Sequence, residues 1–332
     1  MRTTVNSLAE IDRAHASVID IIDRQYVQHK AIDAARINDA AFTIANKSCA
    51  APIGLFDSGV GGLSVYLHLA QQLPSERYVY YADTLNVPYG NRDSAEIEAL
   101  TLKAVEWLYQ QGCKLIVIAC NSASAYALDT ARDAYPQLPI VGLVPALKPA
   151  VLASKSKHVA VLATKATLNG RLLNEVIVSF AHPNGVSVTK YFDPQLVPWV
   201  EAGMPTQDEA AQRLRQQVQT FADAGIDQLV LGCTHYPFFK AFLLDEIARQ
   251  QLSIQVVDSG QAIAERVRQL LVTNQLSAPI NETKSHVSNE NNKTNVCNKQ
   301  ALTFHATKYS DRLGGLVNRL LGEKAVLRYY AK

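Results

Sequence analysis

Two cysteines stand in settings that could do chemistry. Cys120 follows the apolar run KLIVIA and begins the segment CNSASA, and Cys233 follows DQLVLG and begins CTHYPFF. A thiolate is a good base and nucleophile, although most cysteines after a buried strand are inert small hydrophobic residues. Both cysteines are followed at once by hydrogen-bonding residues, which Cys49 and Cys113 lack. The matched pair therefore favours a chemical role for Cys120 and Cys233.

Two thiols on opposite sides of one substrate suit racemisation. One thiolate removes the α-proton from one face of a stereocentre, and the opposite thiol delivers a proton to the other face. An α-proton beside a carboxylate is a weak acid, so the site must stabilise the developing negative charge in a water-poor cleft. His235 lies two residues after Cys233, near enough to tune or activate that thiol.

An internal repeat predicts how the two cysteines are positioned. A helical pattern, a glycine, an apolar run and a cysteine follow one another at residues 94–120 and again at 206–233, with the same spacing from glycine to cysteine. Ligands bind at the carboxyl ends of strands in open α/β sheets, which is where both cysteines are expected. Residues that commonly cap helices stand at both helix starts and ends: Asp93, Ser94 and Gly112 in the first unit, and Thr206, Asp208 and Gly225 in the second.

Alternation of strands and helices predicts the fold class. Helix-like segments separate short apolar runs, which is typical of α/β proteins with parallel sheets. We predict two similar α/β domains with mainly parallel sheets and the active site in the cleft between them. The six predicted strands are residues 53–56, 77–82, 114–119, 158–163, 227–232 and 253–258.

The domain boundaries follow from the same pattern. The first domain is expected at residues 51–146 together with 256–332, and the second at 147–255. Residues 1–50 have apolar residues at helical spacing and predict a helical N-terminal extension. Residues 274–300 are polar and rich in asparagine, and they predict a disordered insertion.

A glycine-rich turn follows the first predicted strand in the segment IGLFDSGVGGLSV. Asp57 and Ser58 stand at the carboxyl end of that strand, and the glycines after them permit a tight turn. The spacing is neither GxGxxG nor a P-loop, so it indicates nucleotide binding only weakly. A helix-capping role for Asp57 is about equally compatible with the pattern. The segment ADTLNVPYGNR predicts a loop, in which Tyr89 is either a pocket residue or an ordinary surface residue.

Composition excludes several function classes. The chain has 332 residues, is 48% hydrophobic and 19% charged, and has a net charge of +2 with no basic block, which argues against nucleic-acid binding. No apolar run reaches membrane-spanning length, and the N-terminus lacks the apolar core of a secretory signal. Five cysteines without a CxxC pair argue against a disulfide framework and a structural zinc site. We expect a cytoplasmic protein with free thiols.

Eight segments together resemble the glutamate racemases of bacterial cell-wall synthesis, in the aspartate/glutamate racemase superfamily. The resemblance implies interconversion of L- and D-glutamate, which supplies D-glutamate for peptidoglycan. It also implies an active site between two α/β domains, and no metal, pyridoxal phosphate or nucleotide cofactor. The segments are GLFDSGVGGLSV, YYADTLNVPYG, IACNSASA, VGLVPALKPA, VAVLATKATL, LVPWVEAG, LVLGCTHYP and VVDSGQAIA, in order across residues 53–264.

The resemblance also assigns roles to residues. It implies that Cys120 is the base for D-glutamate and Cys233 the base for L-glutamate, and that Asp57 and His235 assist them. Glu201 matches an acidic residue of the site. The implied substrate-binding residues are Asp57, Ser58, Pro88, Tyr89, Gly90, Asn121, Ser122, Thr164, Thr167 and Thr234.

The sequence departs from the family pattern at two places, and other functions are compatible with some of its features. Ser122 stands where the family usually has threonine, which keeps the hydroxyl, and Asp193 and Pro194 stand where Cys-Pro is frequent. An aspartate racemase or related isomerase would keep both thiols, but those proteins tend to have a carboxylate at the position of His235. A two-lobed amino-acid-binding protein would not need paired thiols, and a thiol hydrolase would need only one. A cell-wall nucleotide precursor as activator and a homodimer both stay open.

Overall fold

The computed structural model describes residues 48–279, 302–322 and 327–331. Most of the predicted N-terminal extension and of the predicted insertion, at residues 1–47 and 280–301, lies outside the described residues. No helix in the described part of the chain combines the length and the apolar composition that a membrane span needs.

The first of two sheets has six strands in the order β10-β9-β2-β1-β3-β4, and every neighbouring pair is parallel. Its central strand β1 contributes Ile53 and Leu55 to one hydrophobic cluster and Phe56 to another, because successive side chains point to opposite faces. The strands are β1 (Ile53–Asp57), β2 (Tyr78–Ala82), β3 (Leu115–Ile118), β4 (Ile140–Gly142), β9 (Leu302–Ala306) and β10 (Leu327–Ala331).

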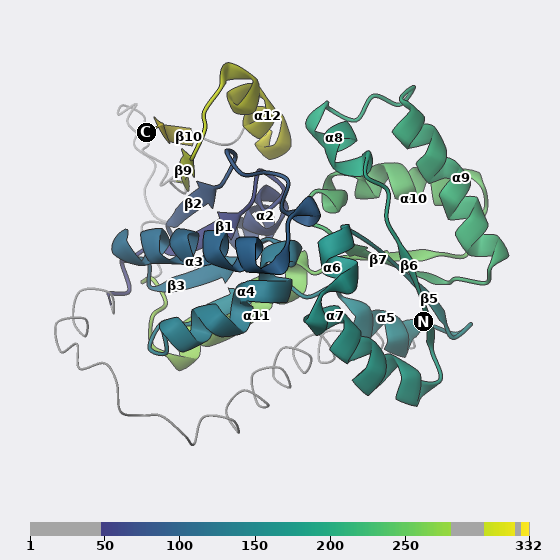
Figure 1. The fold of residues 1–332 in the computed structure, drawn as a ribbon, viewed down its shortest axis with the longest axis horizontal. Coiled ribbons are helices and arrows are strands. Elements are labelled where there is room, and N and C mark those ends of the chain that lie inside the picture. Colours follow the sequence, from purple (N-terminus) through teal and green to yellow (C-terminus); the bar gives the residue numbers. More distant parts are fainter. Residues whose placement is uncertain (1–47, 280–301, 323–326, 332) are drawn as a thin grey trace, which may run out of the picture.

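Helices cover both faces of this sheet, as Figure 1 shows. On one face, α2 packs against α11 and α12; on the other, α3 packs along α4. The sheet therefore lies between two layers of helices, as parallel sheets generally do. The helices are α2 (Leu63–Gln72), α3 (Ser94–Gln110), α4 (Asn121–Ala134), α11 (Gly260–Thr273) and α12 (Asp311–Leu321).

The second sheet has four parallel strands in the order β6-β5-β7-β8. Helices α8, α9 and α10 pack with one hydrophobic cluster of this sheet, and α5 and α7 with the other. The strands are β5 (His158–Ala163), β6 (Ser187–Tyr191), β7 (Gln228–Gly232) and β8 (Gln255–Val257). The helices are α5 (Leu147–Ala153), α6 (Lys165–Asn169), α7 (Arg171–Val176), α8 (Leu196–Glu201), α9 (Glu209–Asp223) and α10 (Lys240–Arg249).

The predicted α/β fold with two parallel sheets is confirmed, and all six predicted strands are present. The six predicted strands do not include β4, β6, β9 and β10. Strand β4 is only three residues long, and β6 is a half-exposed edge strand with the polar sequence SVTKY. Strand β8 pairs with β7 as far as Val257, so the domain boundary predicted at residue 256 falls inside a strand.

The predicted repeat of helix, glycine, strand and cysteine is confirmed. Asp93 caps α3 by accepting a hydrogen bond from the backbone N–H of Glu96, and Asp208 caps α9 through the N–H of Ala210. After each helix the chain turns at a glycine with a left-handed backbone, with φ of 75° at Gly112 and 74° at Gly225. The second helix begins at Glu209, three residues later than its predicted start.

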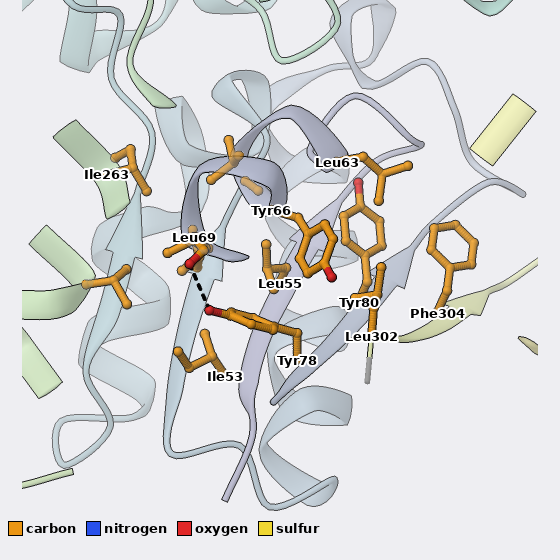
Figure 2. Packing of buried hydrophobic residues seen from close by; sticks show 14 of the residues in the cluster. Ile53, Leu55, Leu63, Tyr66, Leu69, Tyr78, Tyr80, Ile263, Leu302 and Phe304 are labelled. Carbon is orange, nitrogen blue, oxygen red and sulfur yellow. Dashed lines mark hydrogen bonds between the residues drawn. The ribbon is translucent and has the colours of Figure 1, made fainter. Parts of the chain in front are cut away.

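A hydrophobic cluster with three tyrosines supports β1 and α2 (Figure 2). Tyr78 and Tyr80 lie two residues apart on β2, and both side chains are buried. The Tyr78 hydroxyl donates to the backbone carbonyls of Leu69 and Leu73 at the end of α2. The Tyr80 ring stacks on Phe304 of β9, with ring centroids 5.1 Å apart. The tyrosines of β2 therefore hold the C-terminal end of α2 against the first sheet and pack β2 against β9.

A buried ion pair lies at the end of the first sheet opposite the cysteines. Lys114 Nζ lies 2.6 Å from Glu76 Oε2, and the two side chains are 0% and 4% exposed. We expect Lys114→Ala to lower the free energy of unfolding by about 3–5 kcal/mol, because it leaves a buried carboxylate without its partner. Denaturant unfolding would measure this change. As a control, Arg268→Ala breaks the exposed pair with Glu265 and should cost under about 1 kcal/mol. Equal losses in the two variants would contradict the prediction.

Candidate active site

The first sheet places a carboxylate and a thiol at the carboxyl ends of two adjacent strands. Asp57 is the last residue of β1, and Cys120 follows β3 as the N-cap of α4. Asp57 is fully buried, and its Oδ1 accepts a 2.7 Å hydrogen bond from the N–H of Gly59. The Cys120 thiol lies 3.6 Å from the Ser58 hydroxyl. The β1 turn and the start of α4 thus form one side of a polar site.

The second sheet contributes the loop that begins with Cys233 immediately after β7. The Thr234 hydroxyl donates to Asp57 Oδ2 at 3.0 Å, and the backbone carbonyl of Thr234 accepts from the Ser64 hydroxyl at 2.8 Å. Both hydrogen bonds join the second sheet to the β1 turn and α2 of the first. They fix the Cys233 loop against the Asp57 side of the site.

His235 links the Cys233 thiol to a carboxylate. Its Nδ1 lies 3.9 Å from Cys233 Sγ, and its Nε2 lies 3.2 Å from Glu201 Oε1 at the end of α8. Burial alone would lower the pKa of His235, but hydrogen bonds and charge interactions with Cys233 and Glu201 outweigh burial and raise that pKa to about 10. The imidazole is therefore protonated at neutral pH, with one N–H directed to sulfur and the other to carboxylate.

Burial raises the pKa of both Asp57 and Cys120. Burial raises the pKa of Asp57 to about 6, although the positive charge of His235 and the N–H of Gly59 oppose the change. Burial and the negative charge of Asp57 raise the pKa of Cys120 to about 12, against the hydrogen bonds from Ala123 and Ser58. At neutral pH the free protein therefore holds Cys120 as a thiol beside an ionised Asp57.

A chain of hydroxyl groups crosses between the sheets at the other side of the site. Ser122 Oγ, at the start of α4, lies 2.9 Å from Thr164 Oγ1, which in turn lies 3.0 Å from Thr167 Oγ1. Thr164 is the N-cap of α6 and receives the N–H of Thr167. The hydroxyl of Ser122 thus makes the hydrogen bond that was expected of it.

These side chains surround one cavity of about 260 Å³ between the two sheets. Its volume suits a small molecule such as an amino acid. All but two of the predicted site residues line it: Ser58, Pro88, Tyr89, Gly90, Cys120, Asn121, Ser122, Thr164, Glu201, Cys233, Thr234 and His235. The other two, Asp57 and Thr167, contact the lining residues Thr234 and Thr164 from behind.

The sequence did not identify part of the cavity wall. Asp193 is buried, lines the cavity and forms an ion pair with Arg213 at 3.1 Å, which compensates its charge. The position of Asp193 just before the LVP segment was the available signal. The other lining residues that were not predicted are Val87, Asn91, Phe192, Pro194, Val197, Pro198 and Tyr236.

Two buried polar atoms in the cavity-lining residues lack a hydrogen-bond partner in the described part of the chain. They are Asn121 Oδ1 and the Tyr236 hydroxyl. A buried polar atom without a partner is costly, so such atoms are candidates for ligand contacts. Asn121 directly follows Cys120, which places an open acceptor beside one thiol.

The fold and the cavity define a class of two-lobed α/β enzymes that bring one buried thiol from each lobe to a shared interlobe site. The chain belongs to the Asp/Glu/Hydantoin racemase family, whose family model matches residues 53–267. It is therefore an isomerase.

Named relatives make the comparison more specific. The chain is 50% identical to a glutamate racemase from Deinococcus radiodurans over 222 residues, covering 67% of this chain and 75% of the relative. The Escherichia coli glutamate racemase, solved with L-glutamate and the activator UDP-MurNAc-Ala, matches with a TM-score of 0.65 and 30% identity over 85% of this chain and 98% of that one. The Francisella tularensis enzyme, solved with D-glutamate, matches with a TM-score of 0.67 and 26% identity over 86% and 97%.

Proposed function

We propose that this protein interconverts L- and D-glutamate by proton transfer between Cys120 and Cys233, without a cofactor, and so supplies D-glutamate for peptidoglycan. The observation that carries the proposal is that one buried thiol from each lobe lines the same small cavity. A binding protein without chemistry has no need for two such thiols, and a thiol hydrolase would use one.

Cys233 is the base for L-glutamate in this scheme. The protonated His235 directs Nδ1–H toward the Cys233 sulfur and stabilises a thiolate there, while Glu201 compensates the charge on the other ring nitrogen. That thiolate removes the α-proton of L-glutamate. Cys120, which burial keeps protonated, then delivers its proton to the opposite face and yields D-glutamate.

Cys120 is the base for D-glutamate, and it must first lose its own proton. Asp57 is the nearby group suited to accept this proton, because its pKa of about 6 makes its carboxylate a stronger base than an ordinary carboxylate. Thr234 and Gly59 hold the two oxygens of Asp57, so the carboxylate is fixed relative to the thiol.

Substrate recognition follows from the donors and acceptors of the cavity. The hydroxyls of Ser122 and Thr164 are donors for a carboxylate, and the unpartnered Asn121 Oδ1 is an acceptor for the ammonium group. The residue after Cys233 and Thr234 is His235 and not a carboxylate, which favours glutamate over aspartate as the substrate. The names of the relatives agree with this choice.

The direct test measures the formation of D-glutamate and the exchange of its α-proton for deuterium in the same reaction. The wild-type protein is incubated with L-glutamate in deuterium oxide, and D-glutamate and α-deuterium are followed together by chiral chromatography and mass spectrometry. We expect D-glutamate that contains deuterium, and much slower turnover of L-aspartate. Folded protein that neither racemises nor exchanges glutamate would sink the proposal.

The pH profile tests the role of Asp57. We expect kcat/KM for D-glutamate to fall by about tenfold per unit below about pH 6, because protonated Asp57 can no longer take part in removing the Cys120 proton. Activity should rise as the pH increases through 6, since the ionised carboxylate is the active form. Asp57→Asn should lower kcat/KM and remove this acidic limb. A wild-type profile that stays flat down to pH 5 would exclude Asp57 from the step.

Regulation and assembly are further parts of the proposal. The Escherichia coli relative was solved with UDP-MurNAc-Ala as activator, so we propose that a cell-wall nucleotide precursor also activates this protein. Initial rates with and without UDP-MurNAc-Ala test this point. A cytoplasmic location agrees with the free thiols that the chemistry requires. A homodimer stays a prediction, which the mass in solution would decide.

A further inference from the structure

We propose that Tyr80, a residue of β2 outside the cavity wall, is a positioning residue that holds the turn Gly59–Gly62 and thereby fixes Asp57 for proton transfer. The inference rests on the proposed racemisation, and it concerns a residue that does not touch the substrate.

The Tyr80 hydroxyl contacts the Gly59–Gly62 turn at its first and last residues. It donates to the carbonyl of Gly59 at 3.1 Å, at the start of the turn. A Cβ added at Gly62 would lie only 2.8 Å from this oxygen, so the backbone rests directly on the hydroxyl. Tyr80 is fully buried, and Figure 2 shows its hydroxyl end reaching toward Leu63 at the start of α2.

The turn transmits this contact to the reacting groups. The N–H of Gly59, whose carbonyl Tyr80 holds, donates to Asp57 Oδ1. Two residues further on, the turn passes so close to the Cys233 loop that a Cβ on Gly61 would lie 2.4 Å from His235 Nδ1. A shift of the turn would therefore move Asp57 and change the contact between the turn and the Cys233 loop.

The ring of Tyr80 is itself held firmly. It stacks on Phe304 with an angle of 13° between the planes, and β9, which carries Phe304, pairs with β2 along its full length. The hydroxyl therefore has a fixed position relative to the sheet. It acts as a rigid support beneath a glycine-rich segment that has few side chains of its own.

Tyr78 offers a matched control in the same strand and the same cluster. It is equally buried, and its hydroxyl also donates to backbone carbonyls, but these belong to Leu69 and Leu73 at the far end of α2. Tyr78→Phe and Tyr80→Phe thus each remove one buried hydroxyl and keep the ring. Only the second variant removes a contact with the turn.

The test compares both variants with the wild type. We expect both to have a lowered Tm, and only Tyr80→Phe to lose kcat/KM for D-glutamate, by about tenfold, with KM changed far less than kcat. The acidic limb of its pH profile should move to higher pH, because Asp57 loses support from the N–H groups of the turn. The Tyr78→Phe variant keeps the titratable groups that face Asp57, namely Cys120, His235 and Tyr80. Its pH profile should therefore match that of the wild type.

A second measurement needs no substrate. Alkylation of each cysteine by iodoacetamide is followed by peptide mass spectrometry, and Cys120 should react several times faster in Tyr80→Phe than in Tyr78→Phe or the wild type. Equal kcat/KM and equal Cys120 alkylation in the two variants would overturn the proposal. Wild-type protein that does not racemise glutamate would instead refute the proposed function, and the alkylation result would still decide whether Tyr80 positions the turn.

Discussion

Cys120→Ser and Cys233→Ser should each reduce glutamate racemisation by about a thousandfold or more. A serine hydroxyl is a far weaker acid than a thiol, so it cannot supply the base on its face of the substrate. Inversion needs both a base and an acid on opposite faces, and for that reason the loss of either thiol should stop both directions of the reaction. Chiral chromatography of the product measures this directly.

Isotope exchange distinguishes the roles of the two thiols as bases. Cys120→Ser keeps the Cys233 base, so it should exchange the α-proton of L-glutamate for deuterium without forming D-glutamate. Cys233→Ser should do the same with D-glutamate. Cys113→Ala removes a thiol that is also buried but packs in the hydrophobic core of the first sheet, and it should keep near wild-type turnover. Substantial racemisation by either serine variant would show that the two-thiol scheme is wrong.

Gly61→Ala is expected to reduce kcat/KM by about a hundredfold, through geometry alone. The added Cβ would lie 2.4 Å from His235 Nδ1 and 2.5 Å from Thr234 Oγ1, closer than real Cβ contacts allow. The Cys233 loop must move away, which lengthens the hydrogen bond from Thr234 to Asp57 and displaces His235 from Cys233. Steady-state kinetics in both directions would measure the loss.

A second glycine shows whether the effect is specific to that contact. Gly315 on α12 has nothing within 4 Å of an added Cβ, so Gly315→Ala should leave kcat/KM unchanged. The melting temperature of Gly61→Ala should also show that the protein remains folded at the assay temperature. A folded Gly61→Ala variant with wild-type kinetics would show that close contact between the Gly59–Gly62 turn and the Cys233 loop is not needed for catalysis.

The sequence was most informative where hydrophobic runs end abruptly in polar residues. The strands β1, β3 and β7 are buried along their whole length, so each is largely apolar until it reaches Asp57, Cys120 or Cys233. Parallel pairing places the ends of β1 and β3 at the same edge of the first sheet, and β7 ends in the second sheet. Strand β6 gave no such signal, because an edge strand with exposed positions keeps polar residues. Its place beside β5 depends on tertiary pairing rather than on local pattern.

The same distinction explains which site residues could be predicted. Residues next to the cysteines in sequence, such as His235 and Asn121, were accessible from local pattern and resemblance. Asp193 lies far from both cysteines in the sequence, and only the folding of the second lobe brings it to the cavity. Tyr236 directly follows His235 and was not identified as a lining residue. Tyr80 resembled any other buried strand residue, and its contact with the Gly59 carbonyl depends on the register between β1 and β2.

The position of β9 has a consequence for how the protein is made. Strand β9 pairs with β2, yet the entire second sheet lies between them in the sequence. During synthesis on the ribosome, β2 therefore emerges long before its partner and exposes an unpaired edge that other chains could join. Slow or interrupted translation before residue 302 should favour aggregation of the nascent chain, whereas rapid completion lets β9 cover that edge and places Phe304 against Tyr80.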